Sequence, residues 1–224
     1  MEYQKHTSLK DLAQALGVSI PTVSRALKDS PEISRELCAK AKALAKEMNY
    51  RPNPFAMSLR KNAPRIIGVV VPDIVTHFFA SILNGIENMA IANGYFVIIT
   101  TSHESYEHEK RNIENLVNMR VEGIIACLSQ ETTDFSHISA LKDINMPLIL
   151  FDRVCLTDQF SSVIADGAQS AQMATQHLLD NGSKRVAFIG GANHLDIVKR
   201  RKHGYLEALR ENRIPIEKEL VVCR

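Results

Sequence analysis

The residues that could do chemistry on a partner gather between Ser19 and Arg25. Arg25 carries a guanidinium that can hold guanine with two hydrogen bonds in the major groove. The hydroxyl groups near it suit phosphate oxygens, which set register without reading sequence. At helical spacing, one face would carry all the candidate contact residues: Ser19, Ile20, Pro21, Thr22, Ser24 and Arg25. This pattern predicts a helix that enters a DNA groove by its N-terminal end.

The sequence around this face has the layout of a helix-turn-helix. A first helix, capped by Ser8, repeats apolar residues at helical spacing: Leu9, Leu12, Ala13 and Leu16. Gly17 can supply the left-handed conformation of a tight turn, and Val18 can fill the angle between the helices. Ser19 then caps a second helix, which has a proline in its first turn and buries Val23, Ala26 and Leu27. An ordinary helical hairpin is the alternative, but the turn residues and the polar face together favour the DNA-reading motif.

A third helix from Ser34 would close a small core with an apolar stripe: Leu37, Ala41, Leu44, Ala45 and Met48. Its lysines suit a solvated face. Residues 1–62 hold 11 Lys and Arg against 6 Asp and Glu, whereas residues 63–224 hold 16 against 19. The positive charge therefore collects in the part that carries the predicted DNA-reading helix, as phosphate binding requires.

Residues 49–62 read as a linker. Pro52 and Pro54 end the preceding helix and favour an extended chain. Residues 55–60 could form about one and a half helical turns, a length that is marginal in water without a partner. Composition alone indicates a plain tether between domains.

From Arg65 onward, apolar runs alternate with helical patterns, which predicts a parallel α/β sheet built from βαβ units. The expected strands are 66–71, 95–101, 123–127, 148–152, 162–165, 185–190 and 219–222. The expected helices are 79–93, 107–119, 137–144, 168–181 and 200–212. A second subdomain is expected to begin at Ser162 and to receive only two complete strands before residue 224.

In open α/β sheets, ligands bind beyond the carboxyl ends of the strands. The candidate ligand residues after those strands are Phe78, Phe79, Asp152, Arg153, Asp166 and Arg201. Aromatic rings offer an apolar face to sugar C–H groups or bases, and the charged side chains can bond hydroxyl groups. Core packing is the alternative for Phe79, and Arg200 and Lys202 are expected to face solvent.

Several classes of function find no support in the sequence. The GxGxxG, Walker A and GxSxG motifs are absent, so we expect neither an enzyme nor a bound cofactor. The four cysteines are far apart without metal-ligand spacing, and His103 and His108 suggest a metal only weakly against a solvated loop. The polar N-terminus and strand-length apolar runs predict no signal peptide and no membrane span, hence a cytoplasmic protein.

Three segments in this order resemble the lactose/galactose repressor (LacI/GalR) family: TVSRAL at 22–27, NYRPNPFAMSLR at 49–60 and IIGVVVPD at 66–73. The resemblance implies a helix-turn-helix domain at 1–50 and a hinge at 51–64. It also implies a periplasmic-binding-protein-like core, with a first subdomain at 65–161 and a partial second subdomain at 162–224. The hinge would fold on DNA, pair with its copy and push Leu59 into the minor groove. Its expected DNA contacts are Asn53, Ala56, Leu59 and Arg60.

The resemblance also implies a function. Such a protein is a homodimeric transcriptional repressor on a pseudo-palindromic operator, controlled by a small-molecule effector such as a sugar. The resemblance gives effector roles to Asp152, to the aromatic pair before the first core helix, and to the pair Arg201 and Gly204. It further implies a C-terminally truncated repressor, so an effector-insensitive DNA-binding remnant is one alternative. A sugar-binding transport protein is another, although it should carry a secretory leader and no helix-turn-helix.

Overall fold

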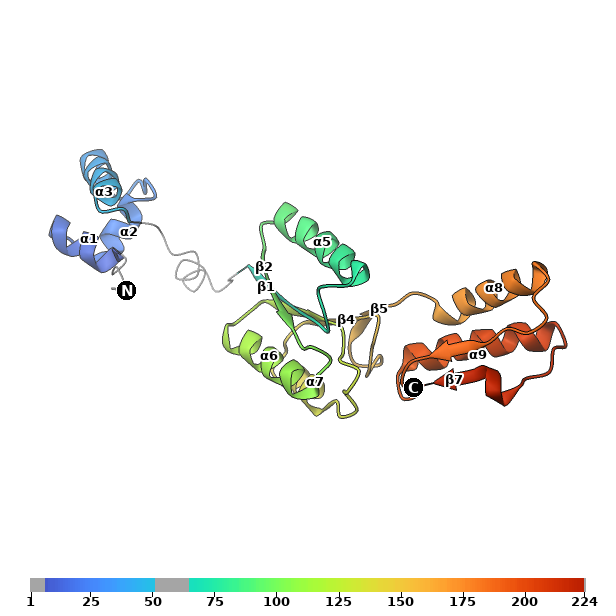
Figure 1. Ribbon diagram of the computed structural model, residues 1–224. Coiled ribbons are helices and arrows are strands. Elements are labelled where there is room, and N and C mark those ends of the chain that lie inside the picture. Colours follow the sequence, from blue (N-terminus) through green and yellow to red (C-terminus); the bar gives the residue numbers. More distant parts are fainter. Residues whose placement is uncertain (1–6, 51–64, 224) are drawn as a thin grey trace, which may run out of the picture. The chain divides into compact units, whose positions relative to one another are not determined.

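The computed structural model describes residues 7–50 and 65–223, which belong to two compact units, 1–62 and 63–224 (Figure 1). The first unit contains three helices: α1 (Leu9–Leu16), α2 (Ile20–Ala26) and α3 (Arg35–Glu47). Leu12 and Val23 are completely buried between them, with the smaller Ala26 and Ala41 where α2 meets α3. This confirms the predicted three-helix core.

Local chemistry explains where these helices start and stop. Each helix begins at a serine whose side chain accepts a hydrogen bond from the backbone N–H three residues on: Ser8, Ser19 and Ser34. Gly17 ends α1 with φ of 65°, in the left-handed region that glycine enters without strain. The predicted caps and the predicted turn glycine are therefore confirmed.

The second unit is built on a five-stranded parallel sheet with the order β2-β1-β3-β4-β5. Its strands are β1 (Ile66–Val71), β2 (Phe96–Thr101), β3 (Gly123–Ala126), β4 (Leu148–Phe151) and β5 (Ser161–Val163). One face is covered by α5 (His77–Ala92), and the other by α6 (Tyr106–Asn118) and α7 (Ser136–Asp143) (Figure 1). Two apolar cores result, one on each side of the sheet.

The interior strand β1 shows why this sheet forms. Val69, Val70 and Val71 are fully buried, because helices cover both faces of the strand. Gly68 lies against α6, where an added Cβ would stand 2.7 Å from a methyl carbon of Leu116. Glycine at this position therefore lets α6 approach the sheet closely.

The remaining residues, 164–223, form what we call the C-terminal lobe. It contains α8 (Gly167–Asp180), β6 (Phe188–Gly190), α9 (Asp196–Glu211), the short 3₁₀ turn η1 (Lys218–Leu220) and β7 (Val221–Cys223). The strands β6 and β7 pair in parallel as a two-stranded sheet. Helix α9 packs on α8 at Gly204, and the Tyr205 hydroxyl donates to the Val186 carbonyl at 2.9 Å.

The structure corrects two expectations about this unit. The strand expected to open the second subdomain at Ser162 instead pairs with β4, and Phe151 lies opposite Val163. It therefore closes the first sheet. The helix expected from residue 200 begins four residues earlier, at Asp196, so Arg200 and Arg201 lie inside α9. Within residues 7–50 and 65–223, no helix combines the length and the hydropathy needed to cross a membrane.

Candidate DNA-contact face and ligand cleft

The predicted DNA-contact residues lie on α2 and at its start. Ser19, Pro21 and Arg25 are exposed, whereas Thr22 and Ser24 are partly buried. Ile20 was expected on the exposed face, but it is partly buried and packs on the core of the three-helix unit. The polar part of the face is thus present at the surface, and Ile20 belongs to it only in part.

Interactions with neighbouring groups hold polar side chains of this face, including those of Arg25, Ser19 and Thr22. Arg25 donates from Nη1 to Glu32 Oε2 at 2.7 Å, with 59% of the arginine side chain exposed. Such an exposed ion pair contributes little to stability, so the guanidinium can exchange this carboxylate for another acceptor. At the start of α2, the Ser19 and Thr22 hydroxyl oxygens are 2.8 Å apart.

The expected hinge contacts Asn53, Ala56, Leu59 and Arg60 lie outside the described residues and stay predictions.

A cleft of about 330 Å³ lies where β3 and β4 end and α9 begins. Its side formed by residues 128–157 includes Ser129, Thr132 and Arg153. The C-terminal lobe contributes His194, Leu195, Asp196, Lys199 and Arg200. A smaller hollow of about 30 Å³ is lined by Asp152, Ile164, Ala165, Gly167, Asp196, Ile197, Arg200 and Arg201. Both lie at the carboxyl end of the sheet, as the sequence predicted.

Ion pairs set the electrostatics of this cleft. Arg153 donates to both carboxylate oxygens of Glu104, at 2.6 and 3.0 Å, and to the Leu128 carbonyl at 3.2 Å. Burial alone would lower the pKa of Arg153, but its bond to Glu104 and the charges around it raise that pKa overall. Burial raises the pKa of Asp152, against the opposing effect of Arg153 and Arg201. Arg200 pairs with Asp196 at 2.5 Å.

The structure therefore brings together three of the six predicted ligand residues: Asp152, Arg153 and Arg201 line the cleft or the hollow beside it. Asp152 takes a left-handed backbone with φ of 58°, directly after β4. Arg200 is exposed, as expected, and it also lines both spaces.

The other predicted ligand residues have different positions. Phe79 is buried in the core on the α5 side of the sheet, with its ring 6.4 Å from that of Phe151. Phe78 is half-exposed, and neither ring lines the cleft. Asp166 caps α8 by accepting the Gln169 N–H. Gly204 has a packing role, because an added Cβ would stand 1.9 Å from the Ala168 carbonyl oxygen.

Sequence reasoning missed one wall of the cleft, the segment Leu128 to Thr132, together with Glu104 that braces it. The signal was present, since the polar run SQETT at 129–133 directly follows the apolar strand GIIACL at 123–128. It also missed His194, which lies just before α9, and Lys199, which lies in the first turn of that helix. Their exposed, charged pattern resembles an ordinary solvated segment.

Comparison with known proteins identifies both units. Residues 8–53 match the family described as "Bacterial regulatory proteins, lacI family". Residues 65–223 match "Periplasmic binding proteins and sugar binding domain of LacI family". Catabolite control protein A of Priestia megaterium is 31% identical over 222 residues, which cover 97% of this chain and 65% of that protein.

Solved structures agree with these matches. The lac repressor dimer bound to operator and the anti-inducer ONPF has a TM-score of 0.75 and 25% identity, covering 98% of this chain and 65% of that chain. The Cra dual regulator of Pseudomonas putida in complex with fructose 1-phosphate has a TM-score of 0.64 and 26% identity, covering 71% and 57%. The chain spans 61 to 65% of the length of the first curated relatives it matches. With both units matched in the same order, the chain belongs to the LacI family of bacterial regulatory proteins.

Proposed function

We propose that this chain is a sequence-specific DNA-binding transcriptional repressor whose operator affinity is controlled by a sugar or a related metabolite. One observation carries the proposal: α2 presents the exposed guanidinium of Arg25 in a three-helix unit that matches the lacI regulatory family. The arrangement suits a recognition helix in the major groove, where arginine reads guanine with two hydrogen bonds.

The ligand arm of the proposal rests on the cleft. Its volume of about 330 Å³ is at the lower end of what small-molecule sites offer, and its walls mix apolar and charged side chains. Lys199 and Arg200 add positive charge on the α9 side, which suits a hydroxylated or anionic metabolite. The matched family includes sugar-binding domains, and a related regulator was solved with fructose 1-phosphate.

A second copy of the chain is the proposed protein partner. Apolar side chains on α5 and the edge strand β2 remain exposed: Phe78, Met89, Phe96 and Ile99. Between these two elements lies a groove of about 490 Å³, whose walls include Ile74, Leu83 and Ile99. Exposed apolar surface of this kind marks an interaction site, and a related lac repressor was solved as a dimer on its operator.

The mechanism follows from linkage. Two recognition helices in a dimer would meet two half-sites, and a ligand in the cleft would change their spacing through the hinge. A ligand can shift operator affinity only by its differential affinity for the two states, typically about 1–3 kcal/mol. The cytoplasm is the compartment where such a regulator meets DNA.

Arg25→Ala tests the proposal on an operator selected from random DNA by the 1–224 chain. We expect the operator-binding free energy to become less favourable by about 1–3 kcal/mol, because a bidentate base contact is lost. The loss should be confined to one base position per half-site. Lys40→Ala is the matched control, since it removes one exposed, ion-paired cation from α3. Binding is measured over all single-base variants of the operator. Equal weakening at every position would show that Arg25 contacts phosphate and not a base. If the chain selects no sequence from random DNA, the proposed function is wrong.

A thermal-shift screen of free sugars and sugar phosphates tests the ligand arm. A ligand that binds the folded chain raises its unfolding temperature, by an amount set by concentration over Kd. The same compound must change operator affinity. A ligand that binds without changing operator affinity, or a screen in which nothing binds, would favour the effector-insensitive alternative.

A further inference from the structure

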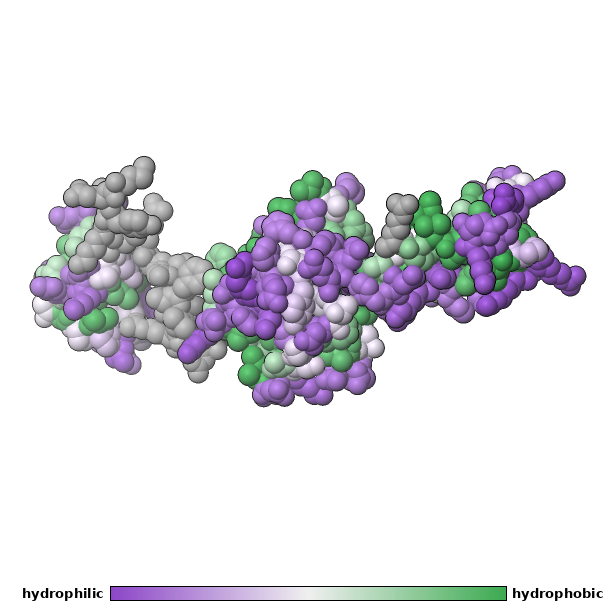
Figure 2. Space-filling view, turned by 60° about the horizontal axis from the view of Figure 1, so that its bottom comes forward, coloured by the Kyte–Doolittle hydropathy of each residue, from purple (hydrophilic) through white to green (hydrophobic). Residues whose placement is uncertain are grey.

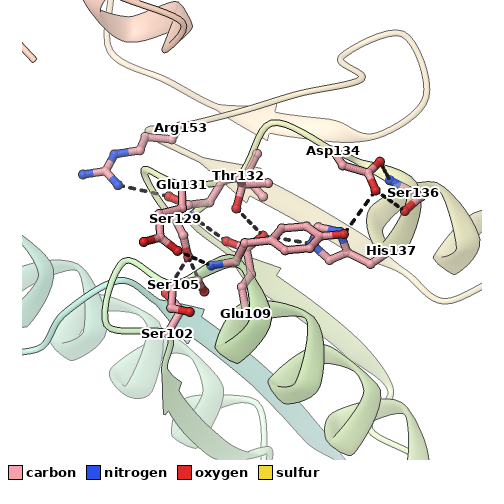
Figure 3. Close-up of polar contacts among 12 residues, drawn as sticks. Ser102, Ser105, Glu109, Ser129, Glu131, Thr132, Asp134, Ser136, His137 and Arg153 are labelled. Atoms are coloured by element: carbon pink, nitrogen blue, oxygen red, sulfur yellow. Dashed lines mark hydrogen bonds and ion pairs between the residues drawn. The ribbon is translucent and has the colours of Figure 1, made fainter. Parts of the chain in front are cut away.

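Glu109 is a fully buried carboxylate on α6 that neither the DNA-contact face nor the cleft walls include. Burying a charge is costly unless the group is well hydrogen-bonded. Figure 3 shows Glu109 of α6 among polar side chains from the segment after β3 and from α7. The groups that donate hydrogen bonds to this carboxylate therefore decide its role.

Three donors converge on Glu109. The Ser129 backbone N–H donates to Oε2, and the Thr132 hydroxyl donates to Oε1 at 2.9 Å. His137 Nε2 lies 2.8 Å from Oε1, with the imidazole side chain 3% exposed. Because the carboxylate accepts, Nε2 carries the hydrogen. Nδ1 of the same ring is buried and has no hydrogen-bond partner among the described residues, which fits a neutral Nε2–H imidazole.

Two of these donors belong to the missed wall of the cleft, since Ser129 and Thr132 both line it. Between them, the Gln130 N–H donates to Glu104 Oε2 at 2.7 Å. The Gln130 carbonyl accepts from His194 Nε2 at 2.8 Å, and His194 comes from the C-terminal lobe. Glu109 and Glu104 thus both bind the segment 129–132. The Gln130 carbonyl of this segment contacts His194 on the opposite wall.

We propose that Glu109 is a positioning residue for the cleft. It anchors the segment 129–132 from behind and thereby aims the Gln130 carbonyl at His194 across the cleft. Glu109 itself is buried behind this wall and does not line the cleft. That this wall belongs to a ligand site rests on the proposed function. The structural link from Glu109 to His194 does not depend on that function.

Glu109→Leu tests the coupling in the ¹⁵N-labelled 1–224 chain. The variant removes all three hydrogen bonds while keeping a buried side chain of similar size. We expect the Ser129 and Gln130 amides to exchange about tenfold faster or more, and the His194 ring nitrogens to shift because their carbonyl acceptor moves. Glu114→Leu, at an exposed position of the same helix, is the control and should leave these signals unchanged.

Glu109→Gln gives a second signature that general destabilisation would not produce. Its side-chain amide offers one acceptor and one donor group in place of two acceptors. A backbone N–H cannot become an acceptor, whereas a hydroxyl and an imidazole can. We therefore expect the amide donor to face Thr132 and His137, and His137 to change from the Nε2–H to the Nδ1–H tautomer in its ¹⁵N spectrum.

Localised exchange at 129–130 together with a His194 shift supports the proposal, whereas the His137 tautomer change reports only the direct contact between Glu109 and His137. Uniform loss of protection over the whole sheet, or an unchanged His194, would show that Glu109 only stabilises the fold. If Glu109→Leu does not fold, Thr132→Val removes one donor and should give the same shifts at smaller size. None of these readouts needs DNA or sugar, so failure of the proposed function would leave them intact.

Discussion

At the scale of single residues, two helical glycines should respond in opposite ways to one added methyl group. In α9, a Cβ on Gly204 would stand 1.9 Å from the Ala168 carbonyl oxygen, whereas a Cβ on Gly85 in α5 meets nothing within 4 Å. Gly204→Ala should therefore destabilise the chain by about 1–3 kcal/mol or more, because α8 and α9 must move apart. Gly85→Ala should stabilise it by about 0.5–1 kcal/mol through helix propensity. Urea unfolding of the two variants measures both, and equal effects would contradict the close helix contact.

The buried thiols predict a loss of stability at high pH. Burial raises the pKa of Cys127 and of Cys155 from an ordinary 9.0 to about 12. Below pH 9, folded and unfolded chains both keep these protons, so stability is unaffected. Between pH 9 and 12 only the unfolded chain releases these protons. The free energy of unfolding therefore falls by about 1.4 kcal/mol per pH unit for each thiol. Cys127→Ala should therefore reduce the fall in unfolding free energy between pH 8 and pH 10, and an unchanged fall would contradict the raised pKa.

Two of the three predicted ligand residues that line the cleft or the hollow share one property, whereas the third, Arg201, lies within α9. Asp152 and Arg153 directly follow a strand, so the sheet itself delivers them to the cleft. Phe79 and Asp166 also follow strands, but the direction of a side chain depends on the next helix: Phe79 turns into the core and Asp166 becomes a cap. Glu109 could not be found, because a glutamate in a charged helix reads as exposed until its three donors are known.

At the scale of elements, most strands and helices of the sheet lie within two residues of their predicted bounds, because buried strands and amphipathic helices have distinct periods. The start of α9 was missed for a physical reason: its cap position is Leu195, which has no side-chain oxygen to mark a helix start. The sheet partner of β5 was missed because pairing is not local, and a three-residue strand carries no signal of its neighbour.

The hinge is the element whose prediction stays open, since it lies outside the described residues. Leu59→Ala should leave the three-helix unit folded, because that core closes among α1, α2 and α3. It should reduce operator bending and specific affinity, since an apolar wedge that unstacks a base step is lost while phosphate contacts remain. Gel mobility of circularly permuted operator fragments measures the bend. An unchanged bend angle would contradict the wedge assignment.

At the scale of the whole molecule, charge and apolar surface are divided between the two units. The positive excess belongs to residues 1–62, where binding to phosphates should become weaker as salt rises. Residues 65–223 instead keep large apolar side chains at the surface, and Figure 2 shows apolar residues among polar ones on the face it presents. One unit thus suits DNA, and the other suits a partner with apolar surface of its own.

Self-association through α5 and β2 is the prediction that belongs to this scale. Ile99 on the edge strand is 43% exposed and lines the groove of about 490 Å³ beside α5. Ile99→Glu would place a charge on this apolar surface, so the dimer dissociation constant should rise about tenfold or more, as for a desolvated charge without a partner. Met119→Glu is the matched control, because Met119 is 58% exposed directly after α6, on the opposite side of the sheet. Sedimentation velocity over a range of concentrations measures both variants. Equal weakening by the two substitutions, or a wild-type chain that stays monomeric throughout, would rule out this face as the dimer contact.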